Sequence, residues 1–113
     1  ILEPNVGAMR VRQWLANHEW VIEDEKVLAE DGHAYQVIAA RRAKEPVQYN
    51  ERELRFGPEL LKDRTNPAFV KIWQGEADRL RQSIHSMQQA KVPPREKIAD
   101  FHRQLSEIEE VLR

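Results

Sequence analysis

The sequence predicts an α/β chain in which a helix and a β-hairpin precede two long helices that fold back on each other. Three patterns predict this. Apolar residues recur at helical spacing over 7–17, an Asp-Gly pair separates two apolar runs, and apolar residues step by three and four through 66–113. We therefore expect two domains, residues 1–65 and residues 66–113.

The first helix is predicted over residues 7–17. Val11, Trp14 and Leu15 recur at helical spacing, and polar side chains occupy the other faces. Asn17 and His18 then mark the end of the helix. We expect Trp14, together with Trp20 from the following segment, to pack the helix on the strands.

A β-hairpin is predicted next, with strands over 20–29 and 34–40 and a turn at 30–33. Asp31-Gly32 is a strong turn signal because Gly accepts a positive φ without a Cβ clash. The acidic run Glu23-Asp24-Glu25 is expected to be a solvated strand end or a bulge. Like charges this close in sequence would be costly to bury.

Residues 41–66 are predicted to be irregular, because Pro46, Gly57-Pro58 and Asn66-Pro67 interrupt them. One short helical stretch is expected at 58–62, where Pro58 suits the first helical position.

The last 48 residues predict an antiparallel two-helix coiled coil. Asn66 is a good N-cap with Pro67 at the first helical position, and Pro93-Pro94 separates the two helices. The predicted contact residues step by three and four on each helix. They are Trp73, Ala77, Leu80, Ile84 and Met87 on the first, and Ile98, Phe101, Leu105, Ile108 and Leu112 on the second.

Composition narrows the class of protein. The 113 residues are 41% apolar and 33% charged, with a mean hydropathy of -0.73. Apolar runs are only a few residues long, so no membrane helix is predicted. The absence of Cys excludes disulfides, Cys-ligated zinc and thiol nucleophiles, and the four scattered His residues have no metal-ligand spacing. We expect a cytoplasmic chain with neither metal nor membrane partner.

The net charge of -1 is unevenly distributed. Residues 1–40 hold three basic and seven acidic side chains, residues 41–64 hold seven and five, and residues 65–113 hold eight and seven. The Arg41-Arg42-Ala43-Lys44 run could contact phosphate, although such a short cluster is more often plain surface.

The opening residues carry a resemblance. Glu3-Pro4-Asn5 after an apolar pair resembles the acceptor loop of class I S-adenosylmethionine-dependent methyltransferases. Further motifs in the same order resemble one family, the bacterial tRNA (adenine-22-N1)-methyltransferases of TrmK type. These motifs are Val11-Arg12-Gln13-Trp14-Leu15, Trp20, Glu30-Asp31-Gly32, Tyr35 and Phe56-Gly57-Pro58.

The resemblance implies a fold class and a partial chain. Residues 1–65 would be the carboxy-terminal half of a class I, Rossmann-like methyltransferase domain, and a helical hairpin would follow it. The sequence begins without Met, and Ile1-Leu2 has the character of a strand end. The glycine-rich cofactor loop would therefore precede Ile1. We expect no cofactor-binding residue in this chain, no S-adenosylmethionine affinity and no activity for the chain alone.

The resemblance also implies an activity and its residues. The longer enzyme would transfer a methyl group from S-adenosylmethionine to N1 of an adenine in tRNA. That atom lies on the Watson–Crick edge, so a paired base must first be exposed. Glu3, Pro4 and Asn5 would be the catalytic loop lining the adenine pocket. Arg10, Arg12, Arg41 and Arg42 are the expected contacts to tRNA phosphates.

Two alternatives remain open from the residues alone. The chain could be a non-enzymatic coiled-coil module that recruits a protein, or part of a class I methyltransferase with another substrate. The outer faces of the predicted hairpin are mostly charged or amide residues, so no second apolar face for a protein partner is evident.

Overall fold

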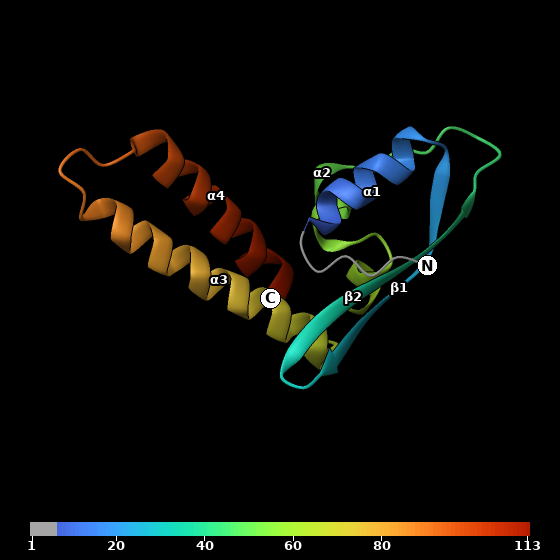
Figure 1. The fold of residues 1–113 in the computed structure, drawn as a ribbon, viewed down its shortest axis with the longest axis horizontal. Helices are drawn as coiled ribbons and strands as arrows, with labels where there is room; N and C mark the ends of the chain where they lie inside the picture. The colour runs from blue at the N-terminus through green and yellow to red at the C-terminus, as the bar shows by residue number, and fades with distance from the viewer. Residues whose placement is uncertain (1–6) are drawn as a thin grey trace. The chain divides into compact units, whose positions relative to one another are not determined.

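The computed structural model describes residues 7–113 and separates the chain into two units, Ile1–Arg64 and Thr65–Arg113. The first, here called the sheet unit, contains α1 (Ala8–Asn17), β1 (Trp20–Glu30), β2 (His33–Arg42), α2 (Glu51–Phe56) and the 3₁₀ helix η1 (Leu60–Asp63). The second, the hairpin unit, contains α3 (Pro67–Gln88) and α4 (Arg95–Leu112), as Figure 1 shows. The predicted α/β class is confirmed, and the strand expected at Ile1-Leu2 lies outside the described residues.

Helix α1 confirms the predicted helix but buries a different face. Its buried residues are Arg12, Leu15 and Ala16. Because each residue turns a helix by about 100°, Trp14 points well away from this stripe. Trp14 is 53% exposed and its ring stacks on that of His18, with ring centroids 4.1 Å apart. The expectation that Trp14 belongs to the core is therefore wrong for this structure.

Strands β1 and β2 form the predicted antiparallel hairpin, and Glu30 pairs with His33 across the turn. Asp31 and Gly32 have φ of 50° and 79°. Positive φ at both central residues is the geometry whose twist matches the two flanking strands. The predicted turn is confirmed.

A bulge in β1 decides which acidic side chain faces inward. Ile22 pairs with Ala40 and Asp24 pairs with Ala39, so Glu23 is an extra residue in β1. One added residue reverses the alternation of side chains beyond it. Ile22 is buried before the bulge, and Glu25 and Val27 are buried after it. The expected bulge is present, but the expectation that the whole acidic run is solvated is wrong because Glu25 is buried.

Helix α2 is an element that the sequence prediction placed in an irregular segment. Its N-cap Asn50 accepts a hydrogen bond from the backbone N–H of Glu53, and the Glu53 side chain accepts one from the backbone N–H of Asn50. This reciprocal capping box stabilises a helix of only six residues. The predicted helical turn near Pro58 occurs slightly later, as η1.

The apolar core of the sheet unit lies between α1 and one face of the hairpin. Leu15, Ile22 and Ile38 form its buried centre, and partly buried residues surround it, namely Val11, Trp20, Ala40 and Tyr49. The Tyr49 hydroxyl accepts a 2.9 Å hydrogen bond from the backbone N–H of Ile22. Desolvation by burial raises the pKa of Tyr49, so its hydroxyl stays protonated near neutral pH.

The hairpin unit consists of α3 and α4, which lie side by side and are joined by a short turn (Figure 1). The predicted N-cap is confirmed, since Asn66 accepts a 2.9 Å hydrogen bond from the backbone N–H of Ala68. Most of the predicted contact residues on α3 are buried, whereas on α4 the burial shifts by one position near the end. The buried side chains are Phe69, Trp73, Ala77, Leu80 and Ile84 on α3 and Ile108 and Val111 on α4.

One pair of valines tests this packing. Val111 is 1% exposed, whereas Val92, in the turn between the helices, is 85% exposed. We expect Val111→Ala to lower the free energy of unfolding by about 2 kcal/mol through lost burial and a cavity. Val92→Ala, the matched control, should change it by less than about 0.5 kcal/mol. Urea unfolding followed by circular dichroism measures both, and equal effects would contradict the packing described here.

Candidate nucleic-acid interface

The predicted catalytic residues Glu3, Pro4 and Asn5 lie outside the described residues. They precede Gly7, the N-cap of α1, which has a left-handed φ of 80°. Gly adopts that conformation without the Cβ clash that other residues meet. What the structure describes is therefore the helix that follows these residues, beginning at its N-cap Gly7.

Arg41 and Arg42 are exposed at the end of β2. The Arg42 guanidinium lies over the Trp20 ring, 5.5 Å from its centroid, which restrains the side chain without neutralising its charge. The backbone N–H of Ala43 donates a 2.8 Å hydrogen bond to the Glu19 carbonyl, so the end of β2 lies beside the end of α1.

A shallow hollow of about 510 Å³ opens beside this strand end. Arg41 and Lys44 line it together with Tyr49 and the intervening segment 45–48. Two cations and a phenol around an open hollow can receive a phosphate group, although Glu45 in the same lining opposes an anion. The hollow is therefore a candidate phosphate-binding surface of the sheet unit.

Arg10 is exposed but belongs to a different part of the surface. It lies in the first turn of α1, and the helical rise separates it by about 10 Å along the axis from Asn17. The end of β2 lies beside that far end of the helix, so the structure does not gather Arg10 with Arg41 and Arg42.

The structure contradicts the prediction that Arg12 contacts phosphate. The side chain has no exposed area, so it cannot meet a ligand from solvent. Its Nε donates to Glu25 Oε2 at 2.7 Å and its Nη2 donates to Gln36 Oε1 at 2.7 Å. Its Nη1 donates to the carbonyls of Leu54 and Arg55 at 3.0 and 3.2 Å. Every arm of the guanidinium is thus engaged inside the sheet unit.

Glu25 completes this buried cluster. Its side chain is fully buried and its Oε1 accepts a 2.8 Å hydrogen bond from the backbone N–H of Glu59. Burial lowers the pKa of Arg12, and the Glu25 charge and hydrogen bond oppose that shift, which favours an ionised pair. The carbonyls at the end of α2 carry partial negative charge, so they also favour the cation.

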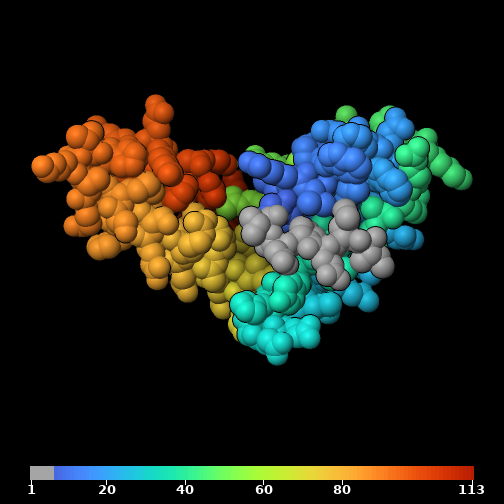
Figure 2. Space-filling view, viewed as in Figure 1, coloured from blue at the N-terminus to red at the C-terminus, as the bar shows by residue number. Residues whose placement is uncertain are grey.

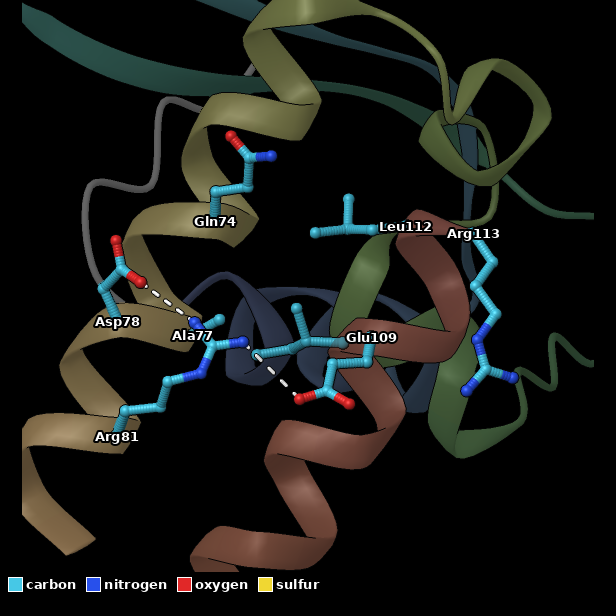
Figure 3. A pocket seen from close by; sticks show the side chains of 8 residues that line it. Gln74, Ala77, Asp78, Arg81, Glu109, Leu112 and Arg113 are labelled. Carbon is cyan, nitrogen blue, oxygen red and sulfur yellow. Dashed lines mark hydrogen bonds and ion pairs between the residues drawn. The ribbon is translucent and has the colours of Figure 1, made fainter. Parts of the chain in front are cut away.

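Three of the four cations that α3 and α4 carry outside residues 89–98 are paired locally. Arg79 pairs with Glu76, and Arg103 pairs with Asp100 and Glu107. Figure 3 shows Arg81 between Asp78 on its own helix and Glu109 on α4, at 2.9 and 3.5 Å. These pairs neutralise the helix faces and leave little field for an anionic partner.

The hairpin tip, residues 89–98, differs. Lys91, Arg95 and Lys97 are exposed there with Glu96 as the single acid, which makes the tip +2. The rest of the hairpin unit holds five bases and six acids. Among residues 7–113 no carboxylate lies in ion-pair contact with these three cations. Figure 2 shows the tip, in orange, at the end of the hairpin unit where α3 and α4 are joined.

Neither a metal centre nor a membrane helix occurs in the part of the chain that the structure describes. No group of three or more His, Cys, Asp or Glu side chains could hold a metal ion there. No helix among these residues is long and apolar enough to cross a membrane.

The sequence analysis missed the basic tip because it compared charge over whole segments rather than against local partners.

Comparisons with known proteins agree on one family. The family model described as TrmK, tRNA (adenine(22)-N(1))-methyltransferase, matches residues 1–110. A curated tRNA (adenine(22)-N(1))-methyltransferase of Bacillus subtilis is 32% identical over 94 residues, which cover 80% of this chain and 39% of that protein.

Solved structures are also similar to this chain. A Streptococcus pneumoniae protein described as a tRNA (m1A22) methyltransferase, in complex with S-adenosyl-L-methionine, is 28% identical with a TM-score of 0.83. A protein of the NADB-Rossmann superfamily from Streptococcus agalactiae is 29% identical with a TM-score of 0.85. Each match covers 99% of this chain and 46% of the other. The chain thus spans less than half the length of these relatives.

The buried pair yields a stability prediction. Glu25→Ala leaves the Arg12 cation without its partner, so the free energy of unfolding should fall by about 3–5 kcal/mol. Replacing both residues, as Arg12→Met with Glu25→Leu, should recover most of that loss because no charge remains buried. Urea unfolding of the three proteins tests this. A double variant as unstable as Glu25→Ala would contradict the idea that the loss comes from leaving one charge buried without its partner.

Proposed function

The chain belongs to the TrmK family of tRNA (adenine(22)-N(1))-methyltransferases, and we propose that it is the tRNA-engaging, carboxy-terminal portion of such an enzyme. The longer enzyme would transfer the methyl group of S-adenosylmethionine to N1 of an adenine in cytoplasmic tRNA. The family match over residues 1–110 carries this proposal.

The chemistry assigned to this chain is positioning. The sulfonium cofactor supplies the electrophilic methyl group, so the protein has to hold the adenine nitrogen in line with it. We assign that role to Glu3, Pro4 and Asn5. The Asn5 side-chain oxygen would accept a hydrogen bond from the exocyclic amine of adenine, and Glu3 would accept a second hydrogen bond or a proton.

Contacts to tRNA phosphates are assigned to two exposed surfaces. The first is the end of β2, where Arg41 and Lys44 line the hollow and Arg42 is exposed over the Trp20 ring. The second is the hairpin tip. Arg10 stays in the proposal as a separate contact on α1, and Arg12 leaves it because Arg12 is buried.

The hairpin unit would act as an arm that presents its basic tip. We propose that its helices pack as a short antiparallel coiled coil. The buried residues of α3 from Trp73 to Ile84, which step by four, three and four, support that packing. A stiff arm with neutralised sides and a charged end would direct tRNA binding to the tip.

The acceptor loop is tested in the longer enzyme by Asn5→Ala. If Asn5 orients the adenine amine, the single-turnover rate of methyl transfer should fall about 10²-fold, while tRNA affinity barely changes. Asn17→Ala removes the same side chain from the exposed end of α1 and serves as the control. A near wild-type rate for Asn5→Ala would return Asn5 to a structural role in the loop.

The tip is tested by exchanging Lys91, Arg95 and Lys97 for Gln together. Losing up to three phosphate contacts should weaken tRNA binding most at low salt, and should reduce the slope of log affinity against log salt by about 2–3. Filter binding across a salt series measures this.

The matched control exchanges Arg79, Arg81 and Arg103 for Gln, which removes the same charge from the paired sides of the hairpin. Its salt slope should change much less, because those cations are already neutralised. Equal losses in both triple variants would mean that net charge alone matters. Unchanged tRNA affinity after removal of residues 65–113 would favour the alternative in which the hairpin recruits a protein.

A further inference from the structure

The cluster around Arg12 and Glu25 bonds α1 to both strands and to α2, and its carboxylate also binds the residue before η1. Through one guanidinium and one carboxylate, α1 is tied to β1, to Gln36 on β2, to the carbonyls at the end of α2 and to the backbone just before η1. Both side chains are fully buried, and among the described residues no buried side-chain polar atom lacks a partner.

We propose that Arg12 and Glu25 are a positioning pair for the acceptor loop, which fixes the place and rotation of α1 and thereby the direction from which residues 3–5 approach the substrate. This inference rests on the proposed function, since it needs Glu3-Pro4-Asn5 to be that loop. Asn5 precedes the N-cap Gly7 by two residues, so any shift of α1 moves the loop's attachment point.

The chemistry of the pair suits positioning. Apolar packing is non-directional, so a helix held only by Leu15 and Ala16 could slide or turn with little change in buried area. A guanidinium has a rigid planar fork of donors, and here it meets four acceptors on three other elements. Such a fork is satisfied in only one placement of the helix. A misplacement of about 1 Å near a reacting centre can slow a reaction by about 10²-fold.

Gly57 shows how tightly the pair is enclosed. Its φ is 97°, and a Cβ placed there would lie 2.7 Å from Glu25 Oε1 and 2.8 Å from Arg12 Nη2. Any larger residue would push the two charged groups out of place without removing either. Gly57 therefore offers a way to disturb the geometry of the pair while both charges stay in the protein.

The experiment compares two glycines in the longer enzyme. Gly57→Ala introduces a methyl group against the pair. Gly32→Ala, in the β-turn, places alanine at a similar positive φ of 79° with nothing within 4 Å, so it adds backbone strain alone. We expect Gly57→Ala to lower the single-turnover rate of methyl transfer about 10-fold or more. The dissociation constants for S-adenosylmethionine and tRNA should stay within about twofold, and Gly32→Ala should keep the wild-type rate.

A second variant covers the case in which Gly57→Ala does not fold. Arg12→Lys keeps the cation but loses the fork, and it should show the same loss of rate with unchanged binding. Val111→Ala, the buried change on α4 in the hairpin unit, controls for loss of stability alone. Melting temperatures are measured for all variants.

Three outcomes overturn the inference. These are wild-type rates in both Gly57→Ala and Arg12→Lys, equal losses in Gly32→Ala, and a loss that Val111→Ala reproduces at the same melting temperature. Failure of the proposed function looks different, because the unmodified enzyme would then leave tRNA unmethylated or Asn5→Ala would keep its rate.

Discussion

The buried ion pair between Arg12 and Glu25 is the interaction on which the sheet unit depends. Two charges can be withdrawn from water only if each is paired and each remaining hydrogen-bonding position is filled. Several local features of the fold serve that requirement. The bulge at Glu23 turns Glu25 inward, the end of α2 supplies two carbonyls, and Gly57 leaves room where any Cβ would collide.

The chain uses its surface charges in a different way. Along the hairpin, cations alternate with acids one helical turn away, which favours solubility and makes only a small contribution to stability. At the tip the acids are fewer, so the positive field is not cancelled locally. Exposed charge of this kind is screened by salt, whereas the buried pair is screened much less. The dependence of a property on salt concentration thus distinguishes an effect of the exposed charges from an effect of the buried pair.

Local chemistry explains which parts of the fold the sequence predicted. Asp31-Gly32 determined the hairpin turn and Asn66-Pro67 the start of α3, because each signal acts within a few residues. Helix α2 also had a local signal, Asn50 followed three residues later by Glu53. The sequence analysis missed this signal because the nearby prolines led it to predict an irregular segment. The family resemblance, rather than residue patterns alone, gave the proposed activity.

The features that sequence reasoning missed are non-local. Arg12 has the pattern of a surface residue on α1, and its partners lie 13, 24 and 42 residues further along the chain. Glu25 has the pattern of a solvated acid until a one-residue bulge reverses its side of the strand. The periodicity of the sequence predicts the burial of neither residue. Each is buried only because the other is its partner and because the end of α2 supplies further hydrogen-bond acceptors.

This interdependence bears on how a methyl-transfer enzyme would use such a unit. The cofactor brings the reactive group, so a protein accelerates the reaction chiefly by holding two partners in line. A directional, buried pair on the helix that follows the proposed acceptor loop would supply placement, and a salt-sensitive tip would supply affinity. The buried pair is shielded from salt, whereas the exposed charges of the tip are screened by it. Mutations in the pair should therefore change the rate of methyl transfer, and mutations in the tip should change the strength of tRNA binding.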